Sequence, residues 1–172
     1  DLGQVLERIS QSIDEERRQQ ADYEELKRQL VSSTRLMQEK WLLELLLGAP
    51  AQSVLAQAKS LDIPLSSYWF RVMLIAAGEK DDMLLVRAHV QRLSSGLDGR
   101  VLLCEAGGHI AAMVMGDSDE DLEERAFAFA QAVKYEVERS AGIKLRVAIG
   151  APTRELEGVA GSYVSAQEVL KA

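Results

Sequence analysis

The chain has 172 residues, of which 47% are apolar and 27% are charged, and it contains only 12 Gly and 3 Pro. This composition is typical of a folded domain and excludes a disordered or fibrous chain. The 20 basic residues are scattered and are outnumbered by 27 acidic ones, so we expect no direct nucleic-acid binding by this segment.

Membrane insertion and export are equally disfavoured by the sequence. The longest apolar run, 41–47, is interrupted by Glu44 and is far shorter than the ~20 residues of a membrane-spanning helix. The single cysteine, Cys104, fits a reducing compartment, so we expect a cytoplasmic location. Because the chain begins with Asp1 rather than Met, we expect it to be a segment of a longer protein.

Residues 2–47 predict one continuous helix, because they contain no proline and are rich in Glu, Arg, Gln and Leu. At ~1.5 Å per residue such a helix exceeds about 60 Å. Its apolar residues recur at steps of four and three, which is typical of a coiled coil, and we predict a homodimer. Glu16 and Gln20 interrupt this seam, either as a tuned weak point or as tolerated polarity. The predicted dimer interface consists of Leu6, Ile9, Ile13, Tyr23, Leu30, Met37 and Trp41.

We therefore divide the chain into a coiled-coil linker helix at 1–48 and a globular domain at 49–172. The domain is predicted to be an α+β, ferredoxin-like sandwich, in which an antiparallel four-stranded sheet carries its helices on one face. The expected elements are a short helix at 51–61, a strand at 68–76, a helix at 79–93, strands at 101–105 and 110–115, a helix from 118 to about 140, a strand at 144–149 and a helix at 154–171.

Three local patterns support this order of elements. The run 68–76 is almost entirely apolar, which predicts a strand buried on both faces. Gly107 and Gly108 predict a tight hairpin turn, because glycine reaches the positive φ angles that such turns require. Ser118 followed by Asp121 is typical of a helix start, and the acidic run 117–124 lacks the glycine and the terminal acid of a calcium loop.

The hairpin, the last strand and the last helix resemble a known family. In this order of elements, Gly107-Gly108, the segment 147–150 (VAIG) and the segment 162–166 (SYVSA) resemble the GGDEF-like domain of bacterial regulators, a nucleotidyl-cyclase-like fold. The resemblance is to the degenerate version in YesN-type response regulators, and 39–48 (EKWLLELLLG) is similar to the linker of those proteins. It implies a receiver domain before this chain and an AraC-type DNA-binding domain after it.

The resemblance also indicates which chemistry is missing. Active members, the diguanylate cyclases, hold divalent metals with carboxylates on the first strand and at the hairpin. Here the hairpin reads Gly107-Gly108-His109-Ile110-Ala111, without either acid, and the first strand ends at Ile75-Ala76-Ala77-Gly78. The nearest acids beyond it are Glu79, Asp81 and Asp82. We therefore expect no catalysis, no metal and no cofactor.

Other candidate residues give weaker signals. The family's product-inhibition motif falls on Asp98 and Val101 and is lost. His89, His109 and Cys104 lack metal-site spacing, so we favour one packed histidine, one exposed histidine and a core cysteine. An anion pocket formed by Arg71, Arg100 and Arg146 is less favoured than solvent-facing arginines, and the aromatic run 68–70 is interpreted as core rather than a ligand cage.

Two functional hypotheses remain. The first is a non-catalytic signal-relay and dimerisation module of an AraC-type two-component response regulator, acting in transcription regulation. The second is a small-molecule sensor that binds an effector in the former nucleotide cleft. The long helix and the missing acids favour the first.

Overall fold

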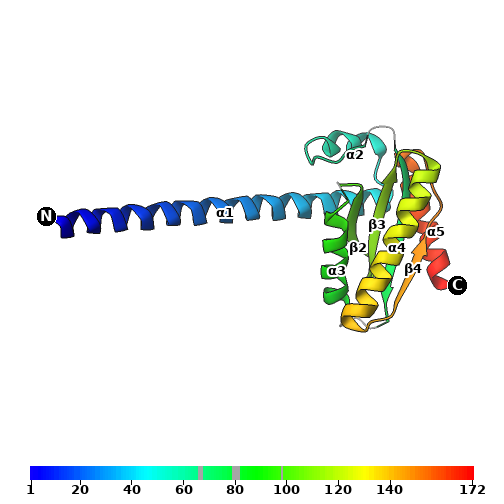
Figure 1. Ribbon diagram of the computed structural model, residues 1–172. Coiled ribbons are helices and arrows are strands. Elements are labelled where there is room, and N and C mark those ends of the chain that lie inside the picture. The colour runs from blue at the N-terminus through cyan, green and yellow to red at the C-terminus, as the bar shows by residue number, and fades with distance from the viewer. Residues whose placement is uncertain (66–67, 79–81, 98) are drawn as a thin grey trace. The chain divides into compact units, whose positions relative to one another are not determined.

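The computed structural model describes residues 1–65, 68–78, 82–97 and 99–172, without the side chains of residues 27 and 29–32 (Figure 1). The chain forms two compact units, Asp1–Met37 and Gln38–Ala172. The second unit includes the last turns of the long helix, which contribute side chains to its core. Among the described residues, no helix combines the length and the apolar character needed to cross a membrane.

The long helix is confirmed. Helix α1 (Leu2–Leu46) has 45 residues, which corresponds to roughly 67 Å at ~1.5 Å per residue. It ends just before Gly48, whose φ of +90° is costly for any residue with a side chain and breaks the helical geometry. Helix α2 (Ala51–Ala58) follows after Pro50.

The sheet has four strands in the order β2-β3-β1-β4, and every neighbouring pair is antiparallel. The strands are β1 (Trp69–Ala77), β2 (Val101–Ala106), β3 (His109–Gly116) and β4 (Leu145–Ile149). Helices α3 (Met83–Ser95) and α4 (Asp119–Ala141) are the two crossovers, and α5 (Val159–Lys171) completes the chain. This arrangement confirms the α+β, ferredoxin-like fold class.

Helices cover both faces of the sheet, whereas we expected them on one face only. One core packs residues such as Met73 and Ile110 against α3 and α4. A second core packs Val72 and Leu74 against α5, α2 and the end of α1. The central strand β1 is buried from Val72 to Ala76, as the continuous apolar run predicted. A strand that is apolar on both faces requires a cover on each, and this is the physical reason for the third layer.

Several element boundaries follow from local hydrogen bonds. Helix α4 begins as predicted, because the Asp121 N–H donates to Ser118 Oγ at 3.1 Å and the Asp121 carboxylate accepts from Asp117 N. The bond from Asp117 N–H lowers the pKa of the Asp121 carboxyl, and the hydrogen bond with Arg125 lowers it further. The last helix begins five residues later than predicted, preceded by the 3-10 turn η2 (Leu156–Gly158). Thr153 is held in extended geometry by a two-bond bridge to Phe70, which delays the helix.

The segments 147–150 and 162–166, which carry the family resemblance, pack against each other. Gly150 N–H donates to Val72 O at 2.7 Å, and Val72 N–H donates to Ser162 Oγ at 2.9 Å. Ala151 N–H donates to Ser165 Oγ at 2.7 Å. A Cβ atom at Gly150 would stand 2.1 Å from the Ser162 carbonyl oxygen. This glycine therefore allows α5 to approach the sheet, so the resemblance in these segments reflects packing.

We predict that Gly150→Ala lowers the free energy of unfolding by about 3 kcal/mol, because the added methyl group meets backbone rather than a movable side chain. The matched control is Gly161→Ala in α5, the helix that packs against Gly150, where a Cβ meets nothing within 4 Å. That change should raise the free energy of unfolding by up to about 1 kcal/mol through helix propensity. Urea denaturation measures both, and equal stability of the two variants would refute the packing role.

Candidate functional site

The β2–β3 hairpin closes with the two glycines predicted from the sequence. Gly107 and Gly108 have φ of +59° and +80°, and Ala106 pairs with His109 across the turn. Positive φ at both central residues is the signature of a type I′ turn, whose twist matches that of the strands. The ideal Cβ position at Gly107 lies 3.4 Å from the Tyr163 hydroxyl oxygen, so α5 also approaches the turn.

The resemblance places the two hairpin acids of active cyclases at His109 and Ile110, and of these two residues only Ile110 is apolar. Ile110, one residue into β3 from the turn, is 1% exposed and packs in the core with α3 and α4. Its cross-strand partner is Ile75, near the end of β1. Ala111 is also fully buried, in the core on the other face of the sheet. Ile110 and the end of β1 therefore meet as apolar positions that cannot bind a metal, whereas the half-buried His109 is the one hairpin position with a side chain that can.

The acids nearest to this place do not form a cluster in the described part of the chain. Asp82 is the residue before α3, at the N-cap position. Glu79, Asp81 and Asp98 lie outside the described residues. Val101, the other position of the product-inhibition motif, is buried in the core. Within the described ranges, no three His, Cys, Asp or Glu side chains come close enough to hold a metal ion.

Cys104 lies in β2, and its side chain packs in the core that includes the end of α1. Burial, followed by the charge of Glu39, raises the pKa of its thiol to about 12. A thiol with this pKa stays protonated at neutral pH and is a poor nucleophile and a poor metal ligand. The interpretation of Cys104 as a core residue is confirmed.

The histidines and arginines are not gathered into a site. His89 and His109 are both half-buried, so the expected contrast of one packed and one exposed histidine is wrong. Arg71 donates to Gly150 O at 2.6 Å, and Arg146 donates to Leu170 O at 3.1 Å. Arg100 forms an ion pair with Asp117 at 2.8 Å and stacks on Tyr68. Each arginine thus has its own protein partner, which argues against a shared anion pocket.

The predicted dimer seam is exposed along the first unit. Leu6, Ile9 and Ile13 are 59%, 51% and 44% exposed, and Tyr23 and Met37 are also exposed. The side chain of Leu30 lies outside the described residues. These apolar side chains recur at coiled-coil spacing on a helix that offers them no cover of its own.

Trp41 is the exception among the predicted seam residues. Its side chain is 1% exposed, packs in the core beneath the sheet, and donates its indole N–H to Val54 O at 2.8 Å. A residue buried in its own domain cannot also pack against a second chain, so the prediction that Trp41 belongs to the dimer interface is wrong. The heptad pattern does not distinguish burial in the chain's own domain from burial against a second chain, because both require an apolar residue at the same spacing.

An ion-pair network that the sequence analysis missed ties the end of α1 to the domain. Arg87 of α3 forms ion pairs with Glu39 of α1 and with Glu105 of β2, the latter at 2.5 Å. These hydrogen bonds raise the pKa of the Arg87 guanidinium. The three residues lie far apart in the sequence and on separate predicted elements. Their opposite charges were the only sequence signal of the network, and such a signal does not identify which charged residues pair. The network joins the helix, the crossover and the edge strand before the hairpin.

Comparison with known protein families gives one result that bears on this site. The family described as GGDEF-like domain matches residues 47–172, which include all four strands of the sheet and the glycine hairpin. A comparison with curated proteins finds no match to the chain.

Proposed function

The chain belongs to the GGDEF-like domain family, and on that premise we propose that it is a non-catalytic module that dimerises through α1 and relays a signal along it. In this proposal the chain is part of a cytoplasmic AraC-type response regulator. A receiver domain would precede α1 and a DNA-binding domain would follow α5. The module would transmit the state of the receiver without acting on nucleotides itself.

The observation that carries the proposal is the exposed heptad stripe of α1. Side chains such as Leu6, Ile9 and Ile13 cost free energy when they stay in water, and burying each one is worth on the order of 1.5–3 kcal/mol. A second copy of the same helix offers the same stripe and buries both. Parallel pairing would place the two copies of each flanking domain side by side, as a dimeric transcription regulator requires.

The relay depends on the junction between helix and domain. Trp41 anchors the last turns of α1 in the core, and Arg87 links Glu39 to the strand that leads to the hairpin. A rotation or shift of α1 within a dimer would therefore act on a part of the helix that is fixed to the sheet. Such coupling operates only if the paired helices have two arrangements of similar energy. Glu16 and Gln20, polar residues at seam positions, are where we expect the pairing to change.

The alternative, a sensor with an effector in the former nucleotide cleft, has less support. Ile110, at one of the hairpin acid positions of active members, is fully buried beside Ile75 near the end of β1. Apolar side chains packed in a core offer neither charge nor hydrogen bonds to a nucleotide. We therefore favour the relay function over this form of sensing.

Dimerisation is tested by adding one negative charge at a position in the predicted dimer seam and, as a control, at a position away from it. Ile13→Glu puts a carboxylate in the predicted interface, and we expect its mass by light scattering to fall to the 19.0 kDa of one chain. The matched control is Gln11→Glu, which adds the same charge on the opposite side of the helix and should remain a dimer. A monomeric wild-type chain, or equal masses for the two variants, would contradict the proposal.

Catalytic silence is tested with GTP and Mg²⁺ or Mn²⁺. We expect no cyclic dinucleotide from the purified chain, because both hairpin acids and the acids at the end of β1 are missing. Restoring the hairpin acids with His109→Asp and Ile110→Glu should leave the chain inactive, since the end of β1 would still lack its acids.

An active diguanylate cyclase serves as the positive control, and circular dichroism establishes whether the double variant folds. Turnover by the unmodified chain above a heat-denatured sample would overturn the assignment as non-catalytic, whatever the double variant does.

A further inference from the structure

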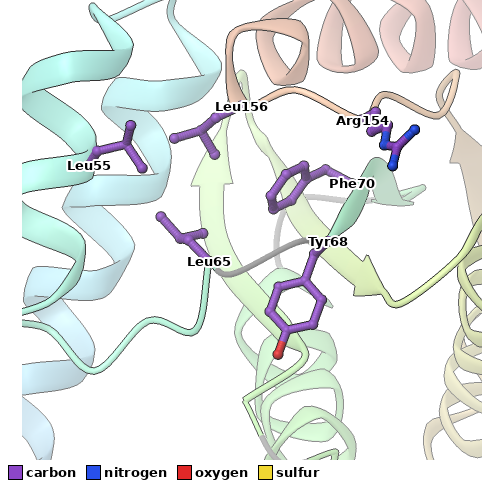
Figure 2. A pocket seen from close by; sticks show the side chains of 6 residues that line it. All are labelled: Leu55, Leu65, Tyr68, Phe70, Arg154 and Leu156. Carbon is purple, nitrogen blue, oxygen red and sulfur yellow. The ribbon is translucent and has the colours of Figure 1, made fainter.

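A cavity of 230 Å³ lies at the start of β1, at the other end of that strand from the hairpin. Figure 2 shows that its three leucine side chains converge on one side of the Phe70 ring, while Arg154 lies on the other side. The cavity is lined by Leu55, Leu65, Tyr68, Phe70, Arg154 and Leu156.

The base of the cavity is rigid. Phe70 N–H donates to Thr153 O at 2.7 Å, and Thr153 N–H donates to Phe70 O at 2.8 Å. This bridge fixes the strand that carries Phe70 to the segment that carries Arg154 and Leu156. Phe70 and Leu156 are only 4% and 8% exposed, so the base of the cavity is well packed. Leu55 of α2, in contrast, is 47% exposed and forms an open apolar wall.

Arg154 brings positive charge to this apolar surface. Its guanidinium lies 5.8 Å from the centroid of the Trp69 ring, a contact that leaves its N–H donors free for other partners. Within the described residues no carboxylate lies within ion-pair distance of Arg154, although Arg87, Arg92, Arg100 and Arg125 each have such a partner. An arginine without an acidic partner beside an apolar cavity is suited to a carboxylate that brings its own apolar body.

We propose that this cavity binds a small amphipathic anion, a monocarboxylate with a short aliphatic or aromatic body. The carboxylate accepts hydrogen bonds from Arg154, and the apolar body lies on Phe70 against Leu55, Leu65 and Leu156. The site goes beyond the relay function and is separate from the former nucleotide cleft. It also has a route to α1, because Leu55 adjoins Val54, whose carbonyl accepts the Trp41 indole N–H.

A second cavity, of 310 Å³, provides the competing location. It lies between the end of α3 and α4, and its lining includes Leu97, Ala132 and the two arginines Arg100 and Arg125. Both arginines are already paired, with Asp117 at 2.8 Å and with Asp121 at 2.9 Å. An incoming carboxylate would have to displace or approach those acids, so this cavity is the less suitable one for an anion.

The experiment titrates the intact 172-residue chain with hexanoate, hexanol and acetate, and follows the Trp69 indole resonance by NMR together with calorimetry. Hexanoate should bind and shift the Trp69 resonance, hexanol should bind about tenfold more weakly, and acetate should not bind measurably. Absence of hexanoate binding, or equal affinity for hexanoate and hexanol, would overturn the proposal.

Three variants locate the site. Arg154→Gln should weaken hexanoate about tenfold and leave hexanol unchanged. Leu55→Glu, at a half-exposed position where folding is not at risk, should abolish hexanoate binding by charge repulsion. Ala132→Leu, which fills the second cavity, should change nothing. Binding that survives Arg154→Gln intact, or that is lost in Ala132→Leu, would place the ligand elsewhere and refute the assignment.

Discussion

The burial of Trp41 at the end of α1 is the contact on which the rest of the structure depends. Its indole ring fills the core beneath the sheet, and its N–H satisfies the Val54 carbonyl of α2. Loss of a buried tryptophan costs about 3–5 kcal/mol, a large fraction of the stability of a domain of this size. Because Trp41 lies in the last turns of α1, side-chain packing holds these turns to the sheet in addition to the covalent connection through the backbone.

Helices bury the sheet on both faces because the central strand β1 is apolar on both faces. A central strand that is apolar on both faces exposes one of them unless a second layer of helices is present. Helix α5 approaches that face closely because Gly150 leaves room for the Ser162 carbonyl, and the ends of α1 and α2 cover the remainder. Ile75 and Ile110 pair across β1 and β3 of this sheet, and both are buried in the core against α3 and α4.

Much of this architecture was predictable, because the signals were local. Proline-free heptads predicted α1, the glycine pair predicted the hairpin, and Ser118 with Asp121 predicted the start of α4. The failures involve partners distant in the sequence. An apolar residue at heptad spacing does not reveal whether its own domain or a second chain buries it, so Trp41 was misassigned. Likewise, the delayed start of α5 depends on the bridge between Thr153 and Phe70.

The relay claim is tested most directly by inserting residues into α1 of the full-length protein after Gln20 and reading a reporter gene with and without the upstream stimulus. Seven added residues keep both halves of the seam in phase, whereas two rotate one half by about half a turn relative to the other. We expect the seven-residue insertion to preserve the response and the two-residue insertion to lock the output on or off. If both insertions respond like the wild type, α1 is a passive tether and the relay account is wrong.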